Sequence, residues 1–310
     1  MENSIATDNT PQTVTLALVG ADSRPKRYEE LTFMDDFLFG KIMSDKQNCK
    51  RFLEILLHID PDTEIADPIS QSSVRVAPGS KSIIVDVRTH DAFNDYDIEA
   101  QKQKHPNLRK RARYYQAMMD IDFLSPGHEY TELRNNYIIF ICLNDIFKKG
   151  LPVYTFRNRC DEDPSVELED CTIKIFLNAS KCDTIEDKEL RTFMEYVKTG
   201  RSQSDYTDII NDLVQKAREN PTWKREYMDA MMDAVRQQRE MREAEEKGLK
   251  AGLEQGLQQG LEQGLEQGER NARLEAARRM LKTGKLSPEE IADITGLSVA
   301  EVKQLQKELA

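Results

Sequence analysis

The hydrophobic and polar positions follow two different periods in the first part of the chain. Over residues 33–59 apolar side chains recur at helical spacing, with a break near Ser44, which predicts a pair of helices. Three runs typical of β-strands follow at 73–77, 80–89 and 96–101, and residues that favour turns separate them. This order predicts a β-meander that comes after the helical pair.

The helical period returns at residues 108–123, and a nearly unbroken apolar run follows at 137–143. Such a run suits a strand that is buried on both faces of a mixed sheet. Two more β-like runs, at 152–159 and 172–179, complete the predicted core. From Asp187 onward the helical pattern dominates as far as the C-terminus.

A shift in composition near Arg239 begins a C-terminal appendage that we expect to be all-helical. Between residues 248 and 268, here called the Gly-Leu repeat, glycine returns every fourth residue and leucine follows each of the first five glycines. Each internal glycine costs a helix about 1 kcal/mol relative to alanine, so we expect a helix that forms on self-association. A flexible spacer rich in Gly, Gln and Glu is the other interpretation.

The last forty residues carry the signals of a small helical unit. Ser287, Pro288 and Glu290 occupy the N-cap, N1 and N3 positions of a predicted helix, and Gly296 interrupts the helical pattern before it resumes. This arrangement is similar to a helix-turn-helix, and it suits a protein-interaction unit nearly as well as a DNA reader.

The chain is therefore expected to have four parts. They are a disordered leader at 1–27, an α/β domain at 28–238, the Gly-Leu repeat as helix or linker at 239–270, and the helical unit at 271–310.

Composition and charge narrow the classes of protein. The formal net charge of -11 excludes general coating of nucleic acid, so binding to DNA would require a local basic surface. The apolar stretch at 14–19 is too short to span a membrane and has no basic flank, which predicts a cytoplasmic protein without a membrane partner. The five cysteines form no CxxC motif and no zinc spacing with histidine, so we expect free, buried thiols in a reducing compartment.

A predicted hairpin carries the residues best suited to chemistry. Asp86 lies among β-branched residues, where a buried carboxylate is costly unless its charge is compensated, and a metal ion is one such compensator. Glu99 and Gln101 lie two positions apart in a strand, so their side chains share a face that a hairpin brings next to Asp86. Mg²⁺ prefers such oxygen ligands. In the other interpretation the two acids only pair with Arg88 and Lys102, or lie on a solvated face.

A basic cluster follows this hairpin directly. Its five members fall within a stretch that contains no acidic residue and are Lys104, Arg109, Lys110, Arg111 and Arg113. Because they lie next to the carboxylates, these cations are candidates for binding DNA phosphates. In the other interpretation they form only a solvated helix face, which is the more common role of a run of basic residues.

Taken in order, these motifs resemble the Rpn family of recombination-promoting nucleases and transposases, within the PD-(D/E)XK nuclease superfamily. The resemblance covers roughly residues 28–200. The motifs that carry it are Asp36-Phe37-Leu38-Phe39, Val85-Asp86-Val87, Ile98-Glu99-Ala100-Gln101, Arg111-Ala112-Arg113-Tyr114-Tyr115, and Gly127 to Tyr130 before the strand Ile138-Ile139-Phe140-Ile141.

The resemblance implies a restriction-endonuclease-like α/β fold, an αβββαβ core with a mixed sheet flanked by helices. It also implies a metal-dependent DNA endonuclease that uses Mg²⁺, or Mn²⁺, and acts in recombination. Asp86 and Glu99 would be metal ligands, and Gln101 would take the place of the family's usual catalytic lysine. Because glutamine is neutral, neighbours such as Arg111 would have to stabilise the transition state. Asp36 is either an additional metal ligand or an ordinary acid at a helix start.

Three functions remain open on the sequence alone. The first is a Mg²⁺-dependent DNA endonuclease. The second is a protein with the nuclease fold that binds DNA without cutting it. The third is an oligomeric scaffold that assembles through its C-terminal helices. Contacts between these helices would also make the protein a homo-oligomer if it has either of the other two functions.

Overall fold

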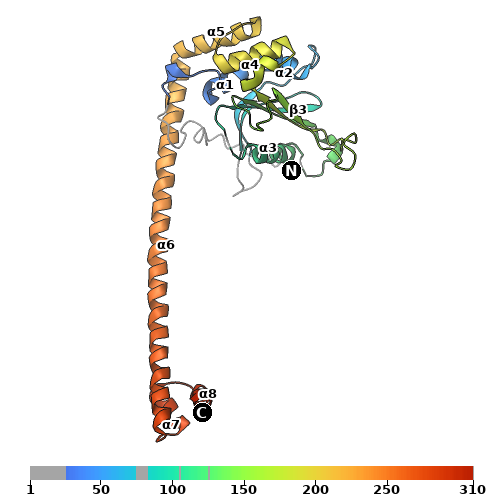
Figure 1. Ribbon diagram of the computed structural model, residues 1–310. Coiled ribbons are helices and arrows are strands. Elements are labelled where there is room, and N and C mark those ends of the chain that lie inside the picture. The colour runs from blue at the N-terminus through green and yellow to red at the C-terminus, as the bar shows by residue number, and fades with distance from the viewer. Residues whose placement is uncertain (1–25, 75–82, 105, 125, 310) are drawn as a thin grey trace, which may run out of the picture. The chain divides into compact units, whose positions relative to one another are not determined.

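The computed structural model describes residues 26–74, 83–104, 106–124 and 126–309 (Figure 1). The chain divides between Gln237 and Gln238 into two compact units, and each is considered by itself. Nearly all of the expected leader lies outside the described residues.

Two short helices open the first unit, as the apolar spacing predicts. Helix α1 spans Asp36–Met43 and α2 spans Lys46–Leu57. Asp45 begins α2 because its side chain accepts a hydrogen bond from the backbone N–H of Asn48, which satisfies one of the free donors at the helix start. The predicted break near Ser44 is confirmed.

Six strands of the described residues form one mixed sheet in the order β1-β2-β3-β4-β6-β5. Strands β1, β2 and β3 are antiparallel, which confirms the predicted meander, whereas β4 lies parallel to both β3 and β6. The strand bounds are Ile69–Val74, Ile83–His90, Asn94–Gln101, Asn135–Cys142, Val153–Phe156 and Thr172–Asn178, from β1 to β6. Strand β1 begins four residues earlier than expected, and parts of the expected strands, at 75–77 and 80–82, lie outside the described residues.

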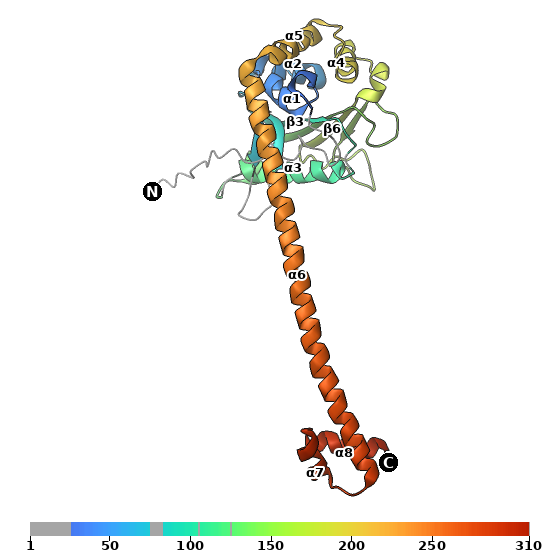
Figure 2. The same cartoon turned by 90° about the vertical axis from the view of Figure 1, so that its left-hand side faces the viewer.

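Helices cover both faces of this sheet (Figure 2). Helix α3, Leu108–Phe123, connects β3 to β4 and packs on one face. Helices α1 and α2 pack on the opposite face with α4, Lys188–Thr199, and α5, Asp205–Glu219. Along β4, Ile139 and Ile141 belong to one core and Ile138 and Phe140 to the other, so this strand is buried on both faces as predicted.

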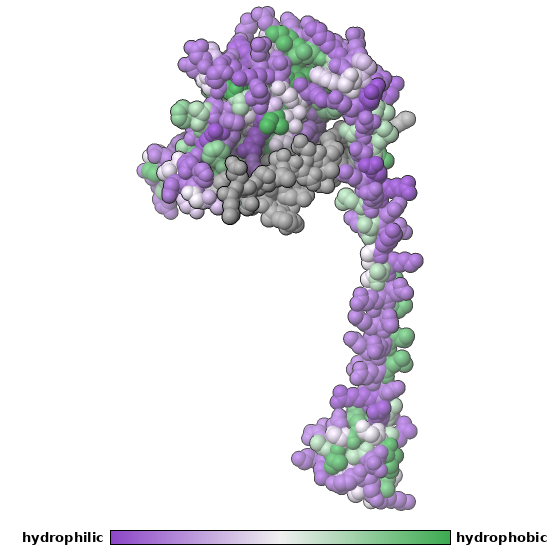
Figure 3. Space-filling view, turned by 180° about the vertical axis from the view of Figure 1, so that it is seen from behind, coloured by the Kyte–Doolittle hydropathy of each residue, from purple (hydrophilic) through white to green (hydrophobic). Residues whose placement is uncertain are grey.

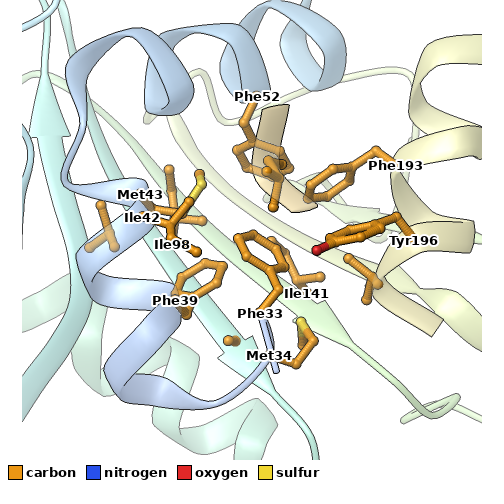
Figure 4. Close-up of a cluster of buried hydrophobic side chains, with 14 of the residues drawn as sticks. Phe33, Met34, Phe39, Ile42, Met43, Phe52, Ile98, Ile141, Phe193 and Tyr196 are labelled. Atoms are coloured by element: carbon orange, nitrogen blue, oxygen red, sulfur yellow. The ribbon is translucent and has the colours of Figure 1, made fainter. Parts of the chain in front are cut away.

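The larger core holds α1 firmly against the sheet. Aromatic rings from α1, α2, α4 and the segment before α1 meet in it, with centroid distances of 5.3 Å between Phe33 and Phe39 and 5.1 Å between Phe52 and Phe193 (Figure 4). At Gly40 the helix comes so close to β1 that an added Cβ would lie 3.2 Å from the Cβ of Ser70. This close approach fixes the position of Asp36 at the start of α1.

The fold class predicted from the sequence, a PD-(D/E)XK-like mixed sheet flanked by helices with a helical C-terminal region, is confirmed. Three short 3-10 helices were not predicted, and they span Tyr28–Glu30, Tyr130–Glu132 and Ala179–Thr184.

Helix α6 spans Pro221–Thr283 and includes the whole Gly-Leu repeat. Its first turns belong to the first unit, where Tyr227 is buried and donates a hydrogen bond of 2.9 Å to the backbone oxygen of Lys26. In the repeat, by contrast, apolar side chains are exposed to solvent along the helix (Figure 3). Its five leucines are 62–75% exposed, and they are Leu249, Leu253, Leu257, Leu261 and Leu265.

The second unit contains the repeat and ends in a small bundle formed by the end of α6 with α7, Pro288–Thr295, and α8, Val299–Leu309. Ser287 accepts from the backbone N–H of Glu290, and Glu290 accepts in return from Ser287, so the predicted capping box is present. The bundle buries Ala277, Ile291, Ala292, Val302 and Leu305.

The cysteines depart in part from expectation. Cys49, Cys142 and Cys182 are buried free thiols, whereas Cys171 is exposed and Cys160 is half-buried, so the expectation that all five are buried is wrong. Cys160 and Cys171 both lie within the loop between β5 and β6, residues 157–171. Among the described residues no helix is both long and apolar enough to cross a membrane.

Candidate active site

The two central acids lie where the pairing of β2 with β3 stops. Backbone pairing between these strands ends at Val87 and Ile98. Beyond that point the backbone N–H of Asp86 donates to Oε1 of Glu99 at 2.9 Å, and the N–H of Ala100 donates to Oδ2 of Asp86 at 3.0 Å. The carboxylates therefore take the place of backbone acceptors, which holds both side chains in the gap between the strands.

The other neighbour of β2 is also irregular at this point. Ser70 and Ser72 of β1 pair with β2, whereas Gln71 between them does not. Gln71 has a φ of 53°, a left-handed conformation that is strained for a residue with a side chain. Strained backbone of this kind concentrates at functional sites, where the surrounding structure enforces it.

Strand β3 turns a row of polar side chains toward α3. Glu99 lies beside Phe140 of the α3 core in the strand register, so Asp97 and Gln101 share this face because they lie two positions away. Asp97 and Glu99 are both fully buried. Neither oxygen of Asp97 has a hydrogen-bond donor among the described residues, and it can bond to Glu99 only when one of the two carries a proton. Sequence reasoning missed Asp97, although the alternation that selects Glu99 and Gln101 also selects it.

Four acids share this site and are called the acidic cluster: Asp36, Asp86, Asp97 and Glu99. Burial, followed by the charge of Glu99, raises the pKa of Asp86 well above its ordinary value. Burial also raises the pKa of Glu99 to about 8, with a further contribution from Asp97. The pKa of Asp97 rises to about 8 for the same reason, with Asp86 as the charged neighbour. The cluster thus concentrates more negative charge than its surroundings neutralise.

Arg111 of α3 is the cation in contact with the cluster. Its Nη2 forms an ion pair with Oε2 of Glu99, and its Nη1 donates to Oε1 of Gln101 at 3.5 Å. The guanidinium lies over the rings of Tyr115 and Phe140, with centroid distances of 5.0 and 5.6 Å. Tyr115, which the helical spacing places in the core, is buried there and also donates to the backbone of β2.

The interpretation of Asp86 and Glu99 as simple partners of Arg88 and Lys102 is wrong. Arg88 pairs with Asp122 at 2.6 Å, and Lys102 pairs with Asp35 at 2.5 Å. Lys102 follows Gln101 in the chain, so its side chain leaves the strand on the other face. Neither cation therefore forms an ion pair with Asp86 or Glu99.

Gln101 adds an amide but no charge to the site. Its Nε2 donates to the backbone oxygen of Gln103 at 2.7 Å, while its oxygen accepts from Arg111. The side chain is only half-buried, at the outer end of the row formed with Asp97 and Glu99. The amide is therefore more accessible from solvent than the carboxylates of Asp97 and Glu99.

Asp36 is the first residue of α1, and Asp35 precedes it as the N-cap residue. Burial and the charge of Asp35 raise the pKa of Asp36, and its own charge raises the pKa of Asp86. Asp36 thus lies within electrostatic range of Asp86. It also borders a cavity of about 260 Å³, whose other lining residues are Phe37, Gly40, Lys41, Ser70, Gln71, Glu226 and Ala230.

The basic cluster divides in two. Lys104, Arg109, Lys110 and Arg113 are exposed near the start of α3, whereas Arg111 turns inward to Glu99. Arg109 is held in place because it lies over the ring of Phe147, 4.7 Å from its centroid. No acid lies in the first turn of α3, so this end of the helix presents positive charge beside the acidic cluster.

The donor atoms of the acidic cluster suit a hard divalent cation. Among the described residues, no three His, Cys, Asp or Glu side chains form a group able to hold a metal ion by themselves. Mg²⁺ needs only one or two carboxylates, because waters and substrate phosphates complete its octahedral shell. Asp86 and Glu99, fixed by the opened ladder and surrounded by uncompensated charge, meet this requirement.

Comparison with known proteins supplies a family. The family model described as PD-(D/E)XK nuclease family transposase matches residues 33–255, well over half of the chain. No curated protein and no solved structure matches the chain. The matched region contains every strand of the sheet, the acidic cluster and the basic cluster. The chain therefore belongs to the PD-(D/E)XK nuclease family transposases.

Proposed function

We propose that this protein is a Mg²⁺-dependent DNA endonuclease that acts in recombination, with Mn²⁺ as a substitute ion. The observation that carries the proposal is the pair Asp86 and Glu99, which replaces the backbone ladder at the open end of β2 and β3. Both side chains are oxygen donors, and the pKa of each is raised by burial and neighbouring acids. Asp36 is the additional acid of this site.

Each group has a distinct role in this proposal. A bound Mg²⁺ supplies a Lewis acid for the scissile phosphate and an activated water. Asp86 and Glu99 hold the ion, and Gln101 offers its amide to the attacking water at the outer end of the row. The exposed cations of the basic cluster, Lys104, Arg109, Lys110 and Arg113, bind the DNA phosphates and orient the strand, because their charge acts without regard to sequence.

Cleavage of plasmid DNA with Mg²⁺, Mn²⁺ or EDTA tests this proposal. Asp86→Asn and Glu99→Gln preserve shape and remove one charge each, so we expect cleavage to fall by about 10²-fold or more. Glu189→Gln is the matched control, since Glu189 is an acid of α4 that pairs with Arg51 of α2 away from the cluster. Undiminished cleavage by folded Glu99→Gln protein would contradict the proposal.

A second function, DNA binding without cleavage, is favoured by one observation. The position of the family's usual lysine holds neutral Gln101, whose amide is already bonded to the backbone of Gln103. A gel shift beside the cleavage assay separates the two functions. Binding that persists in Glu99→Gln protein, with no cleavage by the wild type in any metal, would establish the second function and exclude the first.

We further propose that the protein is a homo-oligomer that assembles through the Gly-Leu repeat. Five exposed leucines lie along this helix, and an added Cβ at any of its glycines would meet nothing within 4 Å. A four-residue step advances the stripe by about 40° per repeat, so the leucines wind around α6. A second copy that winds with it would cover them, while the glycines allow the two backbones to approach closely.

The expected four-part organisation remains a proposal of the same kind. In it, residues 28–238 cut or bind DNA, residues 239–270 assemble the chains, and residues 271–310 contact DNA or a protein. In the last part Lys303 pairs with Glu289 at 2.9 Å, and Glu301 pairs at 3.2 Å with Arg270, the final residue of the preceding part. These ion pairs favour a protein partner over DNA because the cations already have acidic partners.

A further inference from the structure

Arg111 forms an ion pair with Glu99, the carboxylate that binds the metal ion in the proposed function. Oε2 of Glu99 forms the ion pair with Arg111, and Oε1 accepts from the backbone N–H of Asp86. Both oxygens of Glu99 are therefore engaged. A divalent cation at Glu99 would also lie close to the positive guanidinium, and like charges at short range repel strongly in a buried site.

A second acid lies within reach of the same arginine. Asp97 projects from the same face of β3, two residues before Glu99, which corresponds to about 7 Å along a strand. It is fully buried, and neither of its oxygens has a donor among the described residues. The charge of Arg111 partly offsets the rise in the pKa of Asp97, so the two side chains already interact across the site.

Arg111 is itself only partly satisfied. Its Nε is buried and has no acceptor within the part of the chain that the structure describes. Arg88 also acts on Asp97, and its side chain is held by Asp122 at 2.6 Å. An orphaned donor on Arg111 and two orphaned acceptors on Asp97 thus lie in one buried site, and buried polar groups without partners are costly.

We propose that Arg111 is an internal cation that exchanges between two carboxylates. In the metal-free site it neutralises Glu99, and when a divalent cation binds to Asp86 and Glu99 it moves to Asp97. One ion pair replaces another in this exchange, any proton held by Asp86 or Asp97 is released to solvent, and the divalent cation adds the positive charge that the acidic cluster lacks. The inference rests on the metal site of the proposed function.

The exchange gives Asp97 a role that is distinct from holding the metal. Asp97 is a positioning residue that acts through Arg111, since it stabilises the arginine after its departure from Glu99. Arg111 competes with the metal ion for Glu99, and Asp97 lowers the free-energy cost of that competition. Together they set how tightly the protein binds its divalent ion before DNA arrives.

A double-mutant cycle on metal binding tests the exchange without any measurement of cleavage. Binding of Mn²⁺ to the full chain is measured by electron paramagnetic resonance for the wild type, Arg111→Gln, Asp97→Asn and the double variant. We expect Arg111→Gln to tighten Mn²⁺ binding about tenfold, because the competing cation is gone. We expect Asp97→Asn to weaken it, and the factor should be at least tenfold larger when Arg111 is present than in the Arg111→Gln background.

A matched control separates the exchange from a general loss of negative charge. Asp95 is another buried acid on the same face of β3, at its far end, and its cationic partner is Arg134 at 3.8 Å. Asp95→Asn should change Mn²⁺ affinity by the same factor in both Arg111 backgrounds. If Asp97→Asn behaves in this way too, Asp97 acts directly on the metal and the exchange is overturned.

A second measurement covers the case in which Arg111→Gln does not fold. In protein labelled with ¹⁵N, the Nε–H signal of Arg111, assigned by its absence from Arg111→Lys protein, should shift when Mg²⁺ is added to the wild type. In Asp97→Asn protein that shift should be lost, and an equal shift in both would overturn the exchange. Absence of Mn²⁺ binding to every variant would overturn the proposed metal site itself, and the exchange with it.

Discussion

Strand β3 and the Gly-Leu repeat of α6 depart from the usual distribution of side chains in opposite directions. In β3, Asp97 and Glu99 are charged residues with no exposed surface. In the repeat, leucines such as Leu257 are about three-quarters exposed. Buried acids that share a single arginine among the described residues and an exposed apolar stripe are both costly, so each indicates a partner that the single chain does not contain. The first favours a small divalent ion and the second favours another helix.

The two departures differ in how firmly the surrounding structure enforces them. Glu99 lies in the middle of a sheet, between two cores, and cannot leave its position without disrupting both. The leucines of the repeat have no such surroundings, and the helix that carries them includes six glycines. We therefore expect loss of the divalent ion to change the charge of the site at β3 and the free energy of unfolding. Loss of the partner helix should instead change self-association and helix content in the repeat.

The largest effect is expected from removal of the leucine stripe. Burial of one leucine stabilises an interface by about 1.5–3 kcal/mol, so replacement of Leu253, Leu257 and Leu261 by serine should weaken association by roughly 5 kcal/mol, or more than a thousandfold. Sedimentation equilibrium would show a fall to the monomer mass. The control carries serine at the polar positions 255, 259 and 263 and should keep the mass of the wild type. A wild-type chain that is already monomeric would refute the proposed oligomer.

Divalent ions should stabilise the first unit through β3 by a somewhat smaller amount. An ion that binds only the folded state adds about 2.7 kcal/mol to the free energy of unfolding when its concentration is 100 times its dissociation constant. Urea denaturation with Mg²⁺ and with EDTA measures this difference. Glu99→Gln should remove it and Glu189→Gln should keep it, so an equal Mg²⁺ effect in both variants would show that the ion binds elsewhere.

Asp97→Asn should stabilise the metal-free protein at high pH. The folded-state pKa of Asp97 is raised from 3.8 to about 8, so the folded state binds more protons between these values and loses stability as the pH rises through them. Removal of the buried charge should therefore raise the free energy of unfolding by about 1–3 kcal/mol at pH 9. Near pH 4, where Asp97 is protonated in the folded state, the gain should be small.

Denaturation of the wild type and Asp97→Asn at both pH values, with EDTA present, measures this difference. Glu189→Gln is the control, because Glu189 is exposed and pairs with Arg51 away from the acidic cluster. A gain for Asp97→Asn that does not depend on pH would contradict the assigned shift in pKa.

The smallest effect is expected from single glycines of the repeat. Gly256→Ala should stabilise the helix by about 1 kcal/mol, because alanine is the better helix former and its Cβ would meet nothing within 4 Å in the single chain. Circular dichroism of the variant in the monomeric triple-serine background would show the gain in helix content. In the assembling chain the same methyl group should weaken self-association, and unchanged association would mean that the helices do not approach at their glycines.

The sequence was informative where a local pattern and a physical requirement agree. The alternation through Glu99 and Gln101 placed two side chains on one face, as the structure shows, and the β-branched surroundings of Asp86 indicated burial, although its side chain is only half-buried. Likewise, the capping box at Ser287 fixed a helix start, because the hydrogen bonds involved join residues only three positions apart. Local interactions of this kind need no knowledge of the rest of the chain.

Other features of the site depend on residues far apart in the sequence. The pairing of Lys102 with Asp35 joins two elements separated by 67 residues, and it removes Lys102 from the carboxylates beside which the sequence places it. Arg111 resembles its basic neighbours in the sequence, yet it alone turns toward Glu99. Periodicity gives the face on which a side chain lies but not the partner that it meets there.

By itself, the sequence determined the order of helices and strands, the mixed sheet and the two acids that define the candidate site, because these follow from periodicity and from motifs in a fixed order. Only the tertiary structure decided that Asp97 joins the acidic cluster, that Gln71 is strained opposite Asp86, and that Arg111 neutralises Glu99. These features depend on electrostatic and packing contacts between strands and helices, whose geometry is fixed only when the sheet and its two cores have formed.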